Sequence, residues 1–292
     1  MCNIFRSLIQ ILGLLSFSLK GEAENNSEKY KFLMIPYGNM SHLIEMDGLG
    51  RELLARHHEA HVLLAANEKL PEKMSSYGYK VINHPGDSFM PFDENDERMF
   101  ILNEKKLLKF FIGAIYPVMT IHPKLSKSCM VVAKDKKFLS MLKGQRYNMA
   151  VIDNFHSCGY LLASFLELKI VTLSIAIDML TPRWSLLPSM YRANMQIAQG
   201  QFDLDIGMGF GFFDRLIRVL HWLMSPPALA SVLNLPEEIL SEFNISLNTI
   251  NIIEKSELFF LDYEPLFYGE ILPDQPNLII VSGLVTQNSS SI

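Results

Sequence analysis

The chain has 292 residues, of which 49% are hydrophobic, and its formal net charge is −5. A chain of this length can bury a full core, and one large doubly wound α/β domain accounts for it better than two domains. Its mild acidity and its lack of a long basic run argue against nucleic acid as a partner.

Residues 1–23 are predicted to be a signal peptide. The apolar run SLIQILGLLSFSL follows a single arginine and is too short for a good membrane span. Gly21 and Ala23 are small residues at the −3 and −1 positions of a cleavage site. We therefore expect cleavage after Ala23 and entry into the secretory pathway, with an uncleaved anchor or a buried helix as the alternative.

Two cysteines, Cys129 and Cys158, follow the predicted cleavage site. They could form one disulfide, but their separation in space cannot be read from the sequence. Four sequons are candidates for N-glycosylation: Asn25, Asn39, Asn244 and Asn288. The sequon motif often occurs by chance, so each site is a weak signal. A glycan on Asn39 would crowd the loop beside His42.

The segment from Tyr30 to Ala66 has the pattern of a strand, a helix and a second strand. The apolar run 32–35 ends at Pro36, and apolar positions then recur at helical spacing up to Leu54, before a second apolar run at 62–66. In a β-α-β unit of this kind, ligands bind beyond the carboxyl ends of the strands. His42 falls there, in the first turn of the predicted helix.

The next part of the chain predicts one strand and then helices. Residues 78–83 predict the strand, and the polar segment 85–97 a loop. From Arg98 to about Gly144 the apolar spacing is helical, and Pro117 and Pro123 are expected to divide the region into two helices. Five lysines indicate a solvated face rather than an anion site: Lys124, Lys127, Lys134, Lys136 and Lys137.

A second β-α-β unit is predicted after residue 148. Residues 149–152 form a short apolar strand closed by Asp153, a helix is expected from about 157 to 166, and residues 170–175 predict a buried strand. Asp153 thus lies at the carboxyl end of its strand, as His42 lies just after the end of the first strand. If the two strands are neighbours, the two side chains can meet.

A buried carboxylate beside an imidazole has a known chemical use. It accepts the Nδ1 proton, fixes the tautomer, and stabilises the imidazolium that forms when Nε2 removes a proton from a substrate. The alternative is structural, with Asp153 as the N-cap of the following helix and His42 as a polar residue at a helix start. The residues by themselves leave both interpretations open.

Other motifs favour structural roles. The segment from His57 to His61 lacks the H-E-x-x-H spacing, so a turn is favoured over a zinc site. The glycines at 207, 209 and 211 have no preceding strand, which favours a flexible entry to a helix over a cofactor loop. The amphipathic helix 211–224 is expected to pack on the sheet, with membrane-surface contact as the alternative. Strands are expected at 258–261 and 277–283, and a frayed tail at 285–292.

Several segments, in family order, resemble the N-terminal half of the UDP-glycosyltransferases of the animal UDP-glucuronosyltransferase type. They are GNMSH, ARHHEAHVLLA, AVIDNFHSCGYLLASFLELKIVTLS, LLPSMYR, GFFDRL and SELFFLDYEPLFYGEILPDQPNLIIVSGL. In that family two Rossmann-like domains face each other across a cleft, an arrangement called GT-B. The N-terminal domain binds the acceptor, and the C-terminal domain provides most contacts to the UDP-sugar. The family's catalytic histidine falls on His42, and the aspartate that assists it falls on Asp153.

The resemblance implies an inverting glycosyl transfer that needs no metal. His42 would deprotonate a small lipophilic acceptor, which then displaces UDP from a UDP-sugar co-substrate such as UDP-glucuronic acid or UDP-glucose. It also implies the endoplasmic reticulum lumen, membrane association and pairing with related chains. Apolar residues are expected to line the acceptor pocket: Phe89, Phe92, Phe110, Leu187 and Tyr191.

The domain predicted by this resemblance covers residues 24–284. The chain ends with VSGLVTQNSSSI, where the family's chains cross to the donor domain, so the donor half and the membrane anchor are expected to be missing and activity to be low. A catalytically silent small-molecule-binding or regulatory module, paired with a full-length relative, is the alternative. An unrelated secreted hydrolase is disfavoured because no G-x-S-x-G motif is present.

Overall fold

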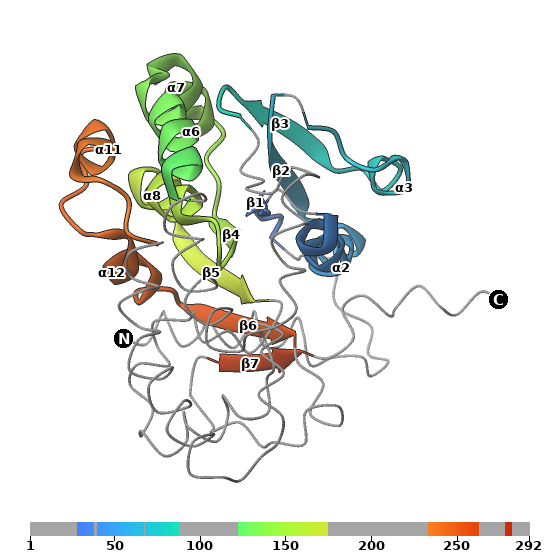
Figure 1. Ribbon diagram of the computed structural model, residues 1–292. Helices are drawn as coiled ribbons and strands as arrows, with labels where there is room; N and C mark the ends of the chain where they lie inside the picture. The colour runs from blue at the N-terminus through green and yellow to red at the C-terminus, as the bar shows by residue number, and fades with distance from the viewer. Residues whose placement is uncertain are drawn as a thin grey trace, which may run out of the picture.

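The computed structural model describes residues 28–37, 40–66, 68–87, 122–174, 233–262 and 278–281. The signal peptide, the glycine-rich segment and the helix predicted at 211–224 lie outside these residues. The described elements, shown in Figure 1, are β1 (Lys31–Ile35), α2 (Met40–Ala55), β2 (Glu59–Ala65), α3 (Glu72–Ser75), β3 (Lys80–His84), α6 (His122–Lys134), α7 (Lys136–Gly144), β4 (Met149–Asp153), α8 (Ser157–Phe165), β5 (Lys169–Ser174), α11 (Glu237–Glu242), α12 (Thr249–Ile253), β6 (Leu258–Asp262) and β7 (Leu278–Val281).

All these strands belong to one parallel sheet with the order β3-β2-β1-β4-β5-β6-β7. The chain first moves outward from β1 to β3, and then returns to the centre to place β4 beside β1. Ile35 at the end of β1 pairs with Ile152 near the end of β4. The fold is therefore a Rossmann-like doubly wound sheet, as predicted, and its strand order reverses between β1 and β4.

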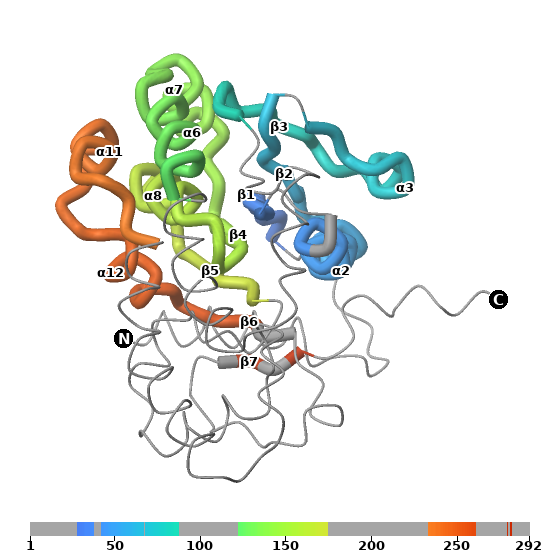
Figure 2. Tube along the Cα trace, in the orientation of Figure 1, coloured from blue at the N-terminus to red at the C-terminus, as the bar shows by residue number. Residues whose placement is uncertain are grey.

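Helices cover both faces of the sheet because successive strand residues point to opposite sides. Leu33 and Ile35 pack into the core beneath α6, α7, α8, α11 and α12, whereas Phe32 and Met34 pack into the core beneath α2 and α3. In Figure 2 the two groups of helices lie on opposite sides of the strands. A strand buried on both faces is apolar at most positions, which explains the uninterrupted apolar run 32–35 in β1.

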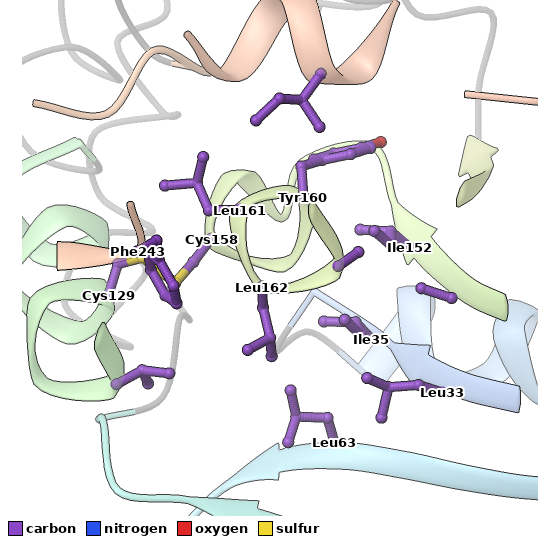
Figure 3. Packing of buried hydrophobic residues seen from close by; sticks show 14 of the residues in the cluster. Leu33, Ile35, Leu63, Cys129, Ile152, Cys158, Tyr160, Leu161, Leu162 and Phe243 are labelled. Carbon is purple, nitrogen blue, oxygen red and sulfur yellow. A yellow bond between two sulfur atoms is a disulfide. The ribbon is translucent and has the colours of Figure 1, made fainter. Parts of the chain in front are cut away.

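A disulfide joins α6 to the first turn of α8. Cys129 and Cys158 are bonded, with their Cα atoms 5.6 Å apart, and both side chains are buried. Figure 3 shows the bond within the first core, beside Phe243 and the leucines of α8. The pairing that the sequence left open is therefore formed.

The helix predicted after Pro123 begins at His122, in agreement with the sequence, but it ends at Lys134, and a second helix, α7, follows Asp135, a break that was not predicted. Pro123 is the second residue of α6, within the first turn, where a missing N–H breaks no helical hydrogen bond. Asp135 is the N-cap of α7, and its side chain accepts a hydrogen bond of 2.8 Å from the N–H of Phe138. Pro117 lies outside the described residues. The five lysines of this region are exposed, as predicted.

The histidine-rich segment after α2 forms a turn and the start of β2. His57 has a φ of 65°, in the left-handed region typical of turns, and β2 begins two residues later. The Nδ1 atoms of His58 and His61 have separate partners, the N–H of Tyr30 and the hydroxyl of Tyr147. Within the described ranges, no group of three or more His, Cys, Asp or Glu residues is placed to hold a metal ion.

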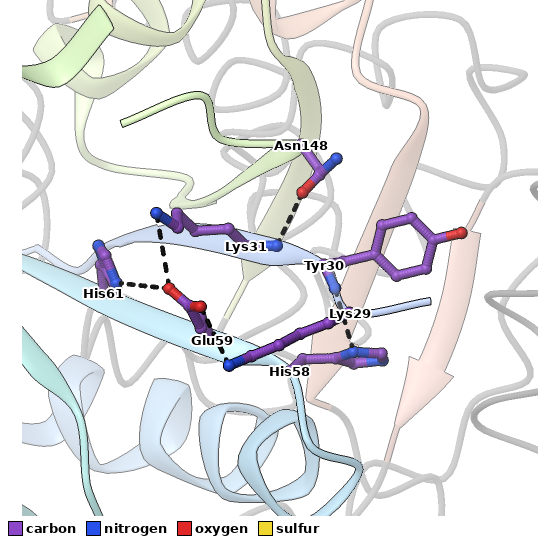
Figure 4. A network of polar contacts seen from close by, with 7 residues as sticks. All are labelled: Lys29, Tyr30, Lys31, His58, Glu59, His61 and Asn148. Atoms are coloured by element: carbon purple, nitrogen blue, oxygen red, sulfur yellow. Dashed lines mark hydrogen bonds and ion pairs between the residues drawn. The ribbon is translucent and has the colours of Figure 1, made fainter. Parts of the chain in front are cut away.

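A polar network lies at the amino edge of the sheet. The carboxylate of Glu59 lies 3.1 Å from Lys29 Nζ, 3.5 Å from Lys31 Nζ and 3.5 Å from His61 Nε2. The N–H of Lys31 donates to the side chain of Asn148 over 2.8 Å. Figure 4 shows that these contacts tie together the starts of β1, β2 and β4. They lie at the edge opposite to the carboxyl ends of the strands.

Of the helices that the structure describes, none combines the length and the apolar character needed to span a bilayer.

Candidate active site

His42 is the third residue of α2, immediately after the loop that follows β1. Buried residues of the same helix, Leu43 and Met46, fix the helix on the sheet. The imidazole is placed at the carboxyl edge of the sheet, and 13% of its side chain is exposed. This is the position that the sequence predicted.

Asp153 is the last residue of β4, and its side chain has no exposed surface. Its Oδ2 lies 2.6 Å from Nδ1 of His42, and its Oδ1 accepts a hydrogen bond of 2.9 Å from the N–H of Phe155. Because β1 and β4 are neighbours, the two side chains meet although 111 positions separate them in the chain. The sequence predicted this meeting on the condition that the two strands are neighbours, and they are.

The geometry defines the tautomer of His42. A carboxylate only accepts hydrogen bonds, so Nδ1 must donate to Asp153. The lone pair then belongs to Nε2, which is the form of imidazole that can remove a proton from a substrate. A positive charge formed on the ring would lie directly beside the buried carboxylate.

The structural alternative for Asp153 is wrong, because the N-cap of α8 is His156. The Nδ1 of His156 accepts a hydrogen bond of 2.9 Å from the N–H of Gly159. Burial, with a smaller effect of the neighbouring His84, lowers the pKa of His156 to about 3, so the ring is neutral and can accept this bond. Sequence reasoning missed this cap because histidine is not among the usual N-cap residues.

Two aromatic rings enclose the imidazole. The ring centroids of Tyr37 and Phe155 lie 5.4 Å and 5.7 Å from that of His42, and 5.8 Å from each other. Each of these residues follows the end of one of the two central strands. Burial, together with the charge of Asp153, raises the pKa of Tyr37, so its hydroxyl remains protonated. Apart from one aromatic residue in each loop, no sequence pattern indicated this cluster.

The predicted acceptor-binding residues lie outside the described part of the chain: Phe89, Phe92, Phe110, Leu187 and Tyr191. The sequons at Asn25, Asn39 and Asn288 also lie outside it. Asn244 is exposed in the turn after α11, with a φ of 56°.

The doubly wound sheet and the His42–Asp153 pair at its switch point define a Rossmann-like protein with a candidate general base. The family model described as UDP-glucoronosyl and UDP-glucosyl transferase matches residues 30–189, more than half of the chain. The protein therefore belongs to this family of glycosyltransferases. No match was found among curated proteins.

Similar solved structures are also glycosyltransferases. The spinosyn forosaminyltransferase SpnP has a TM-score of 0.47 and 15% identity, over 87% of this chain and 51% of that one. The calicheamicin glycosyltransferase CalG4 has a TM-score of 0.46 and 13% identity, over 88% and 52%. UGT2 of Phytolacca americana, solved with UDP-2fluoro-glucose and pterostilbene, has 0.44 and 12%, over 89% and 55%. The chain spans about half of the length of each.

Proposed function

We propose that this chain is the acceptor-binding half of a UDP-glycosyltransferase of the animal UDP-glucuronosyltransferase type, and that His42 is its general base. The observation that carries the proposal is the 2.6 Å contact between Nδ1 of His42 and the buried carboxylate of Asp153. It lies at the switch point of the sheet, where open α/β folds bind ligands, in a chain that belongs to the family.

In the proposed reaction, Nε2 of His42 takes a proton from the hydroxyl, or a similar nucleophile, of a small lipophilic acceptor. The acceptor atom then forms a bond to the anomeric carbon of a UDP-sugar, while the bond from that carbon to the UDP oxygen breaks. Attack from the face opposite to UDP inverts the configuration, and UDP leaves with the electron pair. Asp153 stabilises the imidazolium formed in this step.

The donor in this proposal is a UDP-sugar such as UDP-glucuronic acid or UDP-glucose. The family resemblance assigns most of its contacts to a second Rossmann-like domain that closes over the carboxyl edge of this sheet, in the GT-B arrangement. Turnover is expected to require those contacts as well as the residues of this sheet.

We further propose that the protein resides in the lumen of the endoplasmic reticulum and is membrane-associated and glycosylated. The buried disulfide between Cys129 and Cys158 supports an oxidising compartment, because cytosolic thiols are kept reduced. The exposed turn at Asn244 supports glycan attachment there, since an acceptor asparagine must be accessible. The predicted signal peptide, residues 1–23, would direct the chain to this compartment.

The test supplies a donor domain of the family as a separate chain and measures UDP release with a panel of phenolic and aliphatic alcohols. We expect turnover with the wild type, a loss on the order of 10²–10⁴-fold for His42→Gln, and a comparably heavy loss for Asp153→Asn. His57→Asn is the matched control: His57 is exposed, and asparagine tolerates its positive φ.

Wild-type rates in His42→Gln would contradict the base assignment. Acceptor binding without turnover, with the donor domain present, would instead identify a silent binding module that pairs with a relative.

A further inference from the structure

We infer that Phe155 and Tyr37 are positioning residues that hold the imidazole of His42 in its Nδ1–H form and shield Asp153 from water. The inference rests on the proposed function for its effect on catalysis. Its effect on the tautomer of His42 follows from the geometry alone and can be measured without turnover.

Phe155 contacts both members of the pair. Its N–H donates to Oδ1 of Asp153 over 2.9 Å, which leaves Oδ2 directed at His42. Its ring meets the imidazole edge-on, with an interplanar angle of 76°. One residue therefore fixes the carboxylate through its backbone and restricts the imidazole through its side chain.

Tyr37 restricts the imidazole from the other strand. It follows Pro36, whose fixed φ limits the directions that the chain can take after β1. Its ring is tilted by 58° to that of His42 and by 46° to that of Phe155, and only 7% of the residue is exposed. The ring centroids lie 5.4 to 5.8 Å apart, so the two aromatic rings restrict rotation of the imidazole on the sides that they cover.

The carboxylate of Asp153 has no exposed surface, and the two rings lie beside its partner His42. In water, the neutral side chain of histidine carries its proton mainly on Nε2. The Nδ1–H form therefore requires a hydrogen-bond acceptor for Nδ1 that water does not displace. A hydrogen bond from a neutral donor to a carboxylate is stronger where the surroundings are less polarisable than water. Removal of a ring should admit water to Asp153, weaken its hold on Nδ1, and place part of the proton on Nε2, where it blocks the base.

The experiment uses the full chain with histidine labelled by ¹⁵N in the ring, and His42→Gln to assign the His42 signals. In the wild type we expect Nδ1 to resonate as a protonated nitrogen and Nε2 as a bare one. Phe155→Leu and Tyr37→Leu remove one ring each while retaining an apolar side chain, and each should produce a mixture of the two tautomers. Tyr37→Phe removes only the hydroxyl and should match the wild type.

A purely structural role for the two rings predicts a different result, in which both leucine variants lose stability but keep the wild-type tautomer. That result would overturn the inference, as would an Nε2–H form in the wild type. The two variants alter different loops, so one remains informative if the other fails to fold. An intact Cys129–Cys158 disulfide and a cooperative thermal transition are the checks for folding.

Turnover with the added donor domain gives the second measurement. We expect each leucine variant to lower kcat by roughly tenfold to a hundredfold, with the acceptor KM nearly unchanged, since a misplaced base affects the chemical step. If the leucine variants change the tautomer but the wild type shows no turnover, the proposed function is refuted and the positioning role is supported. If the wild type is active but the leucine variants keep its tautomer, the proposed function is supported and the positioning role is refuted.

Discussion

Gly159 lies where α8 packs against the two central strands. A Cβ atom at this position would lie 3.0 Å from methyl groups of Ile35 and Ile152 and 3.1 Å from Nδ1 of His156. Both isoleucines are fully buried, and their branched side chains have little rotational freedom. A side chain at this position would therefore force these neighbours to move by a few tenths of an ångström.

Gly159→Ala is expected to lower the free energy of unfolding by about 1–3 kcal/mol, because overpacking outweighs the better helix propensity of alanine. Gly144→Ala is the matched control: Gly144 ends α7, and a Cβ there would meet nothing within 4 Å. That variant should gain up to about 1 kcal/mol. Denaturant unfolding measures the free energy of unfolding of both variants. Equal changes in the two would contradict close packing at Gly159.

The Cys129–Cys158 disulfide fixes α8 to α6 at the amino end of α8, next to the His42–Asp153 pair. It joins residues 29 positions apart, and its loop contains α7 and β4. Its stabilising effect should come mainly from the restriction of the unfolded chain.

The double variant Cys129→Ala/Cys158→Ala should lose about 2–4 kcal/mol of the free energy of unfolding. Reductant should destabilise the wild type by a similar amount and leave the double variant unchanged. The measurement is denaturant unfolding with and without reductant. Sensitivity of the double variant to reductant would show that the disulfide is not the cause.

Local sequence predicted most of the strands and the helices beside them, because apolar runs and helical spacing directly reflect burial in this sheet. The contact between His42 and Asp153 was also predictable, since the carboxyl ends of neighbouring parallel strands lie at the same edge of the sheet. The short helices α11 and α12 were missed, because their formation depends on packing against α6 and α8 rather than on a long periodic pattern. The aromatic cluster at Tyr37 and Phe155 was missed because it depends on loop conformation.

Buried histidines make the stability of the protein depend on pH. Burial lowers the pKa of His84 to about 4, and burial with the neighbouring His84 lowers that of His156 to about 3, from an ordinary value of 6.5. Below about pH 6.5 the unfolded chain therefore binds protons that the folded chain does not. The free energy of unfolding should fall as the pH decreases, by about 1.4 kcal/mol per pH unit for each histidine.

The decline should begin near pH 6.5 and continue toward pH 4, where His84 itself starts to accept a proton in the folded state. Denaturant unfolding at pH 7, 6 and 5 measures the slope. His156→Asn retains an N-cap side chain while removing one titrating group, so its slope should be shallower than that of the wild type. The same slope in both proteins would exclude His156 as a source of the effect.

The pairing of β1 with β4 has a kinetic consequence. The β1–β2 pairing joins nearby parts of the chain, whereas His42 and Asp153 are 111 positions apart, and contacts across such distances form slowly because a long loop must first close. The Nδ1 proton of His42 acquires its acceptor only after β4 has docked at the centre of the sheet. During refolding, protection of that proton from solvent exchange should therefore appear after protection of the β1–β2 amides, and it would time the docking of the two β-α-β units.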